Sequence, residues 1–87
     1  MRTIRLEDEA KRQLAELRVS FKRLDEAFAQ IEAALTVKPW IFPQVEGGIV
    51  RRAKLNPYPD LPALSFFFIY DDDYVYLLSA EILESEE

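Results

Sequence analysis

The strongest pattern in the chain is a pair of apolar runs separated by three aspartates. The first run reads Leu64-Ser65-Phe66-Phe67-Phe68-Ile69-Tyr70, and the second reads Tyr74-Val75-Tyr76-Leu77-Leu78. Aromatic and β-branched residues favour strands, and a short polar segment between two such runs is typical of a β-hairpin. Both alternating sets of the first run are apolar, which predicts a strand in the middle of a sheet with both faces at least partly covered.

Two helices are predicted before this hairpin. Acidic residues at the start and apolar residues at i, i+4 and i+7 predict a first helix from about Asp8 to Arg18. Ser20 is a suitable N-cap for a second helix, which carries one apolar stripe and ends before Pro39. Because the turn between them is short, we expect an antiparallel or steeply crossed helical hairpin.

Two further strands complete the predicted order. Residues 2–6 alternate polar and apolar side chains, and residues 49–55 follow a turn at Gly47-Gly48. Residues 56–62 contain three prolines, which predicts an ordered or semi-rigid loop. The order β-α-α-β-β-β indicates an α+β fold, with a helical hairpin packed on a small, mainly antiparallel sheet. We expect one domain over residues 1–87, with residues 83–87 as a frayed acidic tail.

The predicted sheet has more apolar surface than two helices can cover. Two helices shield only one face, so the other face is a candidate surface for a second protein or a second copy of the chain. Trp40, Ile41 and Phe42 form a further apolar group after the second helix. We expect these three residues to cap the core, and the alternative is an exposed aromatic docking site.

Charge divides the chain into two parts. Residues 55–87 contain eight carboxylates and no Lys or Arg, whereas residues 1–54 contain eleven basic and eight acidic residues. The formal net charge of −5 argues against nonspecific nucleic-acid binding, which depends on many Lys and Arg contacts with phosphate. A local basic patch remains compatible with this balance.

Several classes of chemistry are excluded by composition. The chain has no Cys and no His, which rules out disulfides, thiolate or histidine metal sites, and serine–histidine or cysteine–histidine catalysis. We expect no cofactor and no metal site. No apolar run approaches the roughly 20 residues of a membrane span, and the N-terminus has no signal-peptide core, so a cytoplasmic protein without membrane contact is expected.

The densest basic group is Arg51, Arg52 and Lys54. On a strand, Arg52 and Lys54 lie on one face and Arg51 lies on the other. Guanidinium groups make paired bonds to phosphate and stabilise the charge that develops during phosphodiester cleavage, which makes these residues candidates for a catalytic or phosphate-binding site. The alternative is that they pair with the acidic C-terminal third of the chain.

Two other groups have possible chemistry. Asp71-Asp72-Asp73 could attract a divalent cation, but three adjacent carboxylates cannot all converge on one ion, and a solvated turn is the favoured interpretation. The tyrosines, including Tyr70, could stack on bases or donate protons, and the alternative is a structural role in strands.

The element order and three segments together resemble the RelE/ParE toxin superfamily of bacterial toxin–antitoxin systems. These segments are Leu6-Glu7-Asp8-Glu9-Ala10, Arg51-Arg52-Ala53-Lys54-Leu55 and the run from Phe67 to Leu78. The resemblance covers roughly residues 2–82, although none of the segments is an invariant motif. It implies a compact α+β toxin fold, an antitoxin that wraps the sheet and helices, and either ribosome-dependent mRNA cleavage or gyrase inhibition.

The resemblance also implies which residues carry the activity. It assigns the role of the basic strand to Arg51, Arg52 and Lys54, and a weaker role on the hairpin to Tyr70. Members of the family commonly have Arg or His in the last strand, where this chain reads Ser79-Ala80-Glu81-Ile82. The first hypothesis is therefore a toxin-like protein of doubtful catalytic competence that binds an antitoxin and the ribosome or mRNA. The second is a noncatalytic module that forms a homodimer or binds a partner through an aromatic sheet face.

Overall fold

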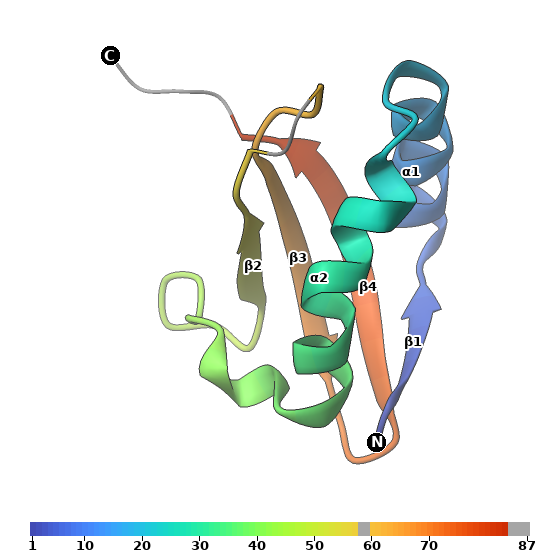
Figure 1. Ribbon diagram of the computed structural model, residues 1–87. Helices are drawn as coiled ribbons and strands as arrows, with labels where there is room; N and C mark the ends of the chain where they lie inside the picture. Colours follow the sequence, from blue (N-terminus) through green and yellow to red (C-terminus); the bar gives the residue numbers. More distant parts are fainter. Residues whose placement is uncertain (58–59, 84–87) are drawn as a thin grey trace.

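The computed structural model describes residues 1–57 and 60–83 of the chain (Figure 1). Its elements follow the predicted order β-α-α-β-β-β, with one short 3-10 turn added. They are β1 (Thr3–Leu6), α1 (Asp8–Ser20), α2 (Leu24–Val37), η1 (Pro39–Ile41), β2 (Arg51–Leu55), β3 (Leu64–Tyr70) and β4 (Tyr74–Ile82). The α+β fold expected from the sequence is confirmed.

The four strands form one mixed sheet in the order β1-β4-β3-β2. β1 runs parallel to β4, whereas β2, β3 and β4 are antiparallel. The hairpin of β3 and β4 closes where the Asp71 N–H donates to the Tyr74 carbonyl at 2.9 Å. β3 and β4 therefore occupy the middle of the sheet, with backbone groups paired on both sides, and for β3 this position was predicted.

The helices take different positions relative to the sheet (Figure 1). α2 crosses one face, and α1 lies beside β4 beyond the point where β1 ends. The Glu7 N–H donates to the Leu77 carbonyl at 3.0 Å, and the Gln13 side-chain oxygen then accepts the Ala80 N–H at 2.7 Å. A glutamine side chain thus satisfies a backbone donor that the short strand β1 does not reach.

The prediction that Ser20 caps the second helix is wrong. α1 continues to Ser20, α2 begins at Leu24, and its N-cap residue Arg23 makes no side-chain capping bond. Phe21, between the helices, packs against the core. Leu24, the first residue of α2, is buried as well. The packing of these two apolar side chains accounts for a turn between Ser20 and Leu24 without a serine cap.

The core lies between the helices and one face of the sheet. Phe66 and Phe68 of β3 are fully buried, and the Phe66 ring meets the ring of Phe28 on α2 edge-on, with centroids 5.2 Å apart. Both helices contribute to the same cluster. The other buried apolar residues are Ala10, Leu14, Leu24, Ala27, Leu35, Ala53, Leu55, Leu61, Leu64, Val75, Leu77 and Ala80.

The three apolar residues after α2 do not all cap the core. Phe42 packs against Phe68 with ring centroids 5.8 Å apart, as expected. Trp40 and Ile41 are 54% and 53% exposed, so the prediction is wrong for these two. Trp40 and Ile41 lie within the 3-10 turn η1, whereas Phe42 follows it in an extended conformation.

The second strand begins later than predicted. β2 starts at Arg51 rather than at residue 49, and Ile49 is 75% exposed. Residues before it form a turn in which Glu46 and Gly47 have positive φ angles of 43° and 72°. Gln44 makes an antiparallel bridge to Arg51. The tight turn therefore ends the ladder, because its left-handed residues cannot continue an extended strand.

The remaining segments are only partly described. Tyr58 and Pro59 of the predicted proline-rich loop, and residues 84–87 of the predicted tail, lie outside the described residues. Leu83 is held to the sheet by its N–H, which donates to the Ala63 carbonyl at 2.9 Å. Within residues 1–57 and 60–83, no helix combines the length and apolarity needed to cross a membrane.

Candidate functional site

The structure divides the four predicted site residues between two places. Arg52 and Lys54 pair with Phe67 and Ser65 of β3, on the face away from α2. Arg51 pairs with buried Phe68 and lies, with Tyr70, at the end of the sheet near η1. Successive side chains of β2 point to opposite faces of the sheet, so Arg51 is separated from Arg52 and Lys54, as the sequence predicted. The four residues therefore do not converge on one reacting group.

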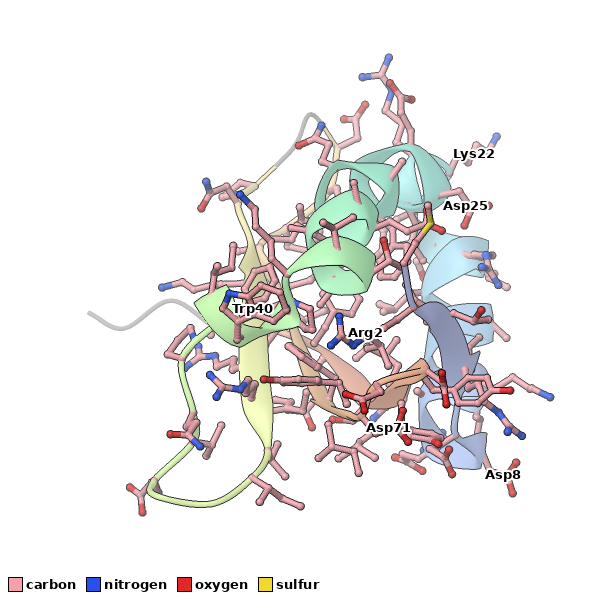
Figure 2. The ribbon with its side chains drawn as sticks, turned by 90° about the horizontal axis from the view of Figure 1, so that it is seen from below. Arg2, Asp8, Lys22, Asp25, Trp40 and Asp71 are labelled. Carbon is pink, nitrogen blue, oxygen red and sulfur yellow. The ribbon has the colours of Figure 1, made fainter. Side chains whose placement is uncertain are left out.

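Arg51 and Tyr70 belong to a stack of aromatic rings and guanidinium groups. The Arg2 guanidinium carbon lies 5.5 Å from the centroid of the Trp40 ring and 5.3 Å from that of Tyr70. The corresponding distance from Arg51 to the Tyr70 ring is 5.7 Å. Figure 2 shows Arg2 between Trp40 of η1 and Asp71 of the hairpin turn. We call Arg2, Trp40, Tyr70 and Arg51 the cation–π stack.

Hydrogen bonds hold both arginines of the stack in place. The Arg51 Nη1 group donates to the carbonyls of Trp40 at 3.2 Å and Phe42 at 2.6 Å. The Arg2 Nε group donates to the Asp71 carbonyl at 2.6 Å. These bonds join β1, η1, β2 and the β3–β4 turn at one end of the sheet. Arg51 is therefore a structural cross-link as well as a cation.

The second place is the face of the sheet that α2 does not cover. Its residues are Phe67, Ile69, Tyr74 and Tyr76 in the middle, with Arg5, Arg52 and Lys54 toward the edges, and we call this set the open sheet face. The exposed carboxylate of Glu81, which pairs with Ser65, lies on the same face. The four central residues are half-buried, and Arg5 and Lys54 are exposed. An apolar, aromatic centre with basic edges suits a partner that is both apolar and acidic.

Local contacts orient the cations of the open sheet face. Arg52 Nε donates to the hydroxyl of buried Ser65 at 3.1 Å. The Arg5 guanidinium lies 5.3 Å from the Tyr74 ring centroid. Within residues 1–57 and 60–83, Arg52 and Lys54 form no ion pair with a carboxylate. Two carboxylates are nevertheless their neighbours, because Glu81 pairs with Ser65 beside Lys54 and Glu46 lines the same hollow as Arg52.

Sequence reasoning missed two of these cations. Arg2 and Arg5 appear in the sequence as the polar positions of a half-buried strand, which is an ordinary pattern. Their importance arises because β1 pairs in parallel with β4, which brings Thr3 opposite Tyr74 and Arg5 opposite Tyr76. No local signal marks this long-range pairing. The tyrosine-rich strand was the only indication that cations would have aromatic neighbours.

The hairpin turn uses its first aspartate as a backbone cap. The Asp71 Oδ1 atom accepts the N–H groups of Asp73 and Tyr74, each at 2.8 Å, and Oδ2 accepts the Tyr76 hydroxyl at 3.1 Å. The two backbone bonds hold the pKa of Asp71 below its ordinary value of 3.8. The pKa of Tyr76 is raised, mainly by desolvation and to a smaller extent by its hydrogen bond to Asp71. In the part of the chain that the structure describes, no three carboxylates cluster as a metal site.

This capping predicts a specific response to acid. Because the pKa of Asp71 is lower in the folded state, its contribution to stability is complete above the unfolded pKa and is lost as the pH falls below about 4. We expect the unfolding free energy of Asp71→Asn to be lower than that of the parent at pH 7 and to change less on acidification. Urea unfolding of both proteins at pH 7 and pH 3 measures this difference.

The matched control is Asp72→Asn. Asp72 lies next to Asp71 in the same turn and is exposed. Its substitution removes the same charge without removing the backbone cap, so its unfolding free energy is expected to follow that of the parent at both pH values. Equal behaviour of the two variants would show that net charge, rather than the cap, controls the acid response.

No protein-family model matches the chain, and no curated protein or solved structure is significantly similar to it. The functional assignment therefore depends on the residues and their geometry.

Proposed function

We propose that the chain is a toxin-like component of a bacterial toxin–antitoxin module, with the open sheet face as its working surface. The observation that carries the proposal is the position of the basic strand β2 beside the aromatic hairpin of β3 and β4 in one sheet. This is the arrangement that the resemblance to the RelE/ParE superfamily implies. In this role Arg52 and Lys54 bind phosphate of the ribosome or mRNA, and an antitoxin covers the same face.

Growth and bulk translation in a bacterial host test this proposal. Induction of the parent chain is expected to stop both, and the double variant Arg52→Ala, Lys54→Ala is expected to restore them, because its surface has lost two phosphate-binding cations. The control is Lys11→Ala, Lys22→Ala, which removes the same charge from exposed positions outside the sheet, on α1 and in the turn between the helices. Arrest by all three proteins would contradict a role for the basic strand.

A second function is favoured by the stack. Arg51 and Tyr70, two of the residues that the resemblance assigns to catalysis, make structural contacts at the sheet end. The half-buried residues Phe67, Ile69, Tyr74 and Tyr76 meanwhile leave an apolar surface on the open sheet face. These two observations support a noncatalytic module that binds a protein partner or a second copy through that face.

Sedimentation across a range of protein concentrations tests whether the chain forms a homodimer, as the noncatalytic module would. A homodimer through the open sheet face is expected to dissociate in Ile69→Lys, because this variant places a charge at the centre of the interface. The dimer is expected to persist in Val19→Lys, whose substitution is at an exposed position of α1. A parent chain that stays monomeric and does not affect growth would contradict both the toxin and the homodimer.

A further inference from the structure

A hollow beside the end of β3 extends beyond the open sheet face, with which it shares only Ile69. β2 begins opposite Phe68, so the last two residues of β3 have no strand neighbour on that side. The turn of residues 44–50 bends away and leaves a hollow of about 330 Å³. Its lining residues are Gln44, Ile49, Arg51, Ile69 and Tyr70, and we call it the β3-end hollow.

Three hydrogen-bonding side chains line the β3-end hollow. Arg51 uses Nη1 for the carbonyls of Trp40 and Phe42. Within the described residues, its Nη2 group, the Tyr70 hydroxyl and the Gln44 amide make no hydrogen bond to protein, and no carboxylate pairs with Arg51. A fixed cation and two neutral donors therefore adjoin one space, which is the combination that recognises an anion.

The walls of the hollow also offer apolar surface to a ligand. Ile49 is 75% exposed, and Ile69 is half-buried. These side chains offer apolar surface directly beside the donors, and covering such surface is favourable. A ligand that combines a small anionic head with a branched aliphatic group would satisfy both features.

We propose that the β3-end hollow binds a carboxylate attached to an aliphatic group, as in an acylated leucine or the C-terminal leucine of a peptide. One carboxylate oxygen accepts from Arg51 and the other accepts from Tyr70 and Gln44, while the aliphatic group packs on Ile49 and Ile69. A monoanion is favoured over phosphate, because one guanidinium lines the hollow and three aspartates follow Tyr70 in the chain. This inference does not depend on the proposed toxin-like role.

Nuclear magnetic resonance titration of the full chain with N-acetyl-leucine tests the proposal. We expect saturable shifts of the backbone amide signals of the five lining residues. N-acetyl-leucine amide has the same aliphatic group without the charge, and it is expected to bind roughly tenfold more weakly or not at all. Equal binding of acid and amide, or shifts that never saturate, would overturn the proposal.

Two variants remove a hydrogen-bonding group from the hollow while the fold is expected to be kept. Tyr70→Phe removes only the hydroxyl and keeps the ring of the cation–π stack, and Gln44→Ala removes an exposed amide. Each is expected to weaken binding roughly three- to tenfold, whereas Gln30→Ala, at an exposed position of α2, leaves binding unchanged. Parent-like affinity in both hollow variants would show that the carboxylate is bound elsewhere.

The source of the carboxylate is resolved by a second probe. Tighter binding of a short peptide that ends in leucine assigns the hollow to a protein C-terminus, and equal binding assigns it to a free small acid. Both results support carboxylate recognition. Inorganic phosphate that shifts the same five signals while N-acetyl-leucine does not would instead contradict it.

Discussion

Replacing Phe66 by alanine is expected to remove a large part of the stability of this domain. The Phe66 side chain is fully buried on the central strand β3, and its ring packs edge-on against Phe28 of α2. Deleting such a ring costs about 3–5 kcal/mol, because transfer energy is lost and a cavity remains. The free energy of unfolding of a small domain is about 5–15 kcal/mol in total, so the melting temperature is expected to fall by roughly 15 °C or more. Thermal unfolding followed by circular dichroism measures the change.

Phe67→Ala is the matched control for this prediction. Phe67 is the next residue of the same strand, but it lies on the open sheet face and is only half-buried. The same atoms are removed from a surface that stays in contact with water, so we expect a loss of about 1 kcal/mol. If the two variants were equally stable, the assignment of the two sheet faces would be incorrect.

Replacing Arg51 by alanine is expected to cost about 2–3 kcal/mol in unfolding free energy. The substitution removes two charged hydrogen bonds, to the carbonyls of Trp40 and Phe42, and the contact with the Tyr70 ring. Hydrogen bonds to charged groups contribute about 1.5–3 kcal/mol, and the Phe42 carbonyl loses its partner in a partly buried position. Urea unfolding measures this loss, with Trp40, the single tryptophan, as a fluorescence probe at the affected site.

Arg52→Ala is the neighbouring comparison. Within the described residues, the Arg52 side chain makes one hydrogen bond, to the Ser65 hydroxyl, so its replacement is expected to cost only about 1 kcal/mol. The contrast affects the interpretation of any growth assay. Loss of activity in Arg51→Ala would report a weakened fold, whereas loss in Arg52→Ala would report the chemistry of the open sheet face. Similar stability of the two variants would remove this distinction and make Arg51 a candidate for a direct role.

The basic and acidic parts of the sequence lie side by side in the folded sheet. The acidic C-terminal third supplies the two central strands, and four of the eleven basic residues of the N-terminal part lie on the edge strands β1 and β2. Arg5 is on one side of the open sheet face, with Arg52 and Lys54 on the other. A ligand on this face therefore meets cations at two edges, although the chain as a whole carries a formal charge of −5.

Local patterns determined the elements of this protein. Two apolar runs around three aspartates specify the β3–β4 hairpin, and Pro39 marks the end of α2, because strand propensity and proline sterics act over a few residues. The faces of Arg51 and Arg52 followed from the two-residue period of a strand. These features depend on neighbours in the chain, so the sequence alone was sufficient for them.

Tertiary structure decided how those elements combine into sites. The parallel pairing of β1 with β4 brought Arg2 to Tyr70 and Arg5 to Tyr74, although more than 65 residues separate each pair in the chain. Packing of Phe21 moved the start of α2 away from Ser20, and the early end of the β2–β3 ladder formed the β3-end hollow. Such contacts depend on the summed burial and pairing energies of distant segments, which no local pattern contains.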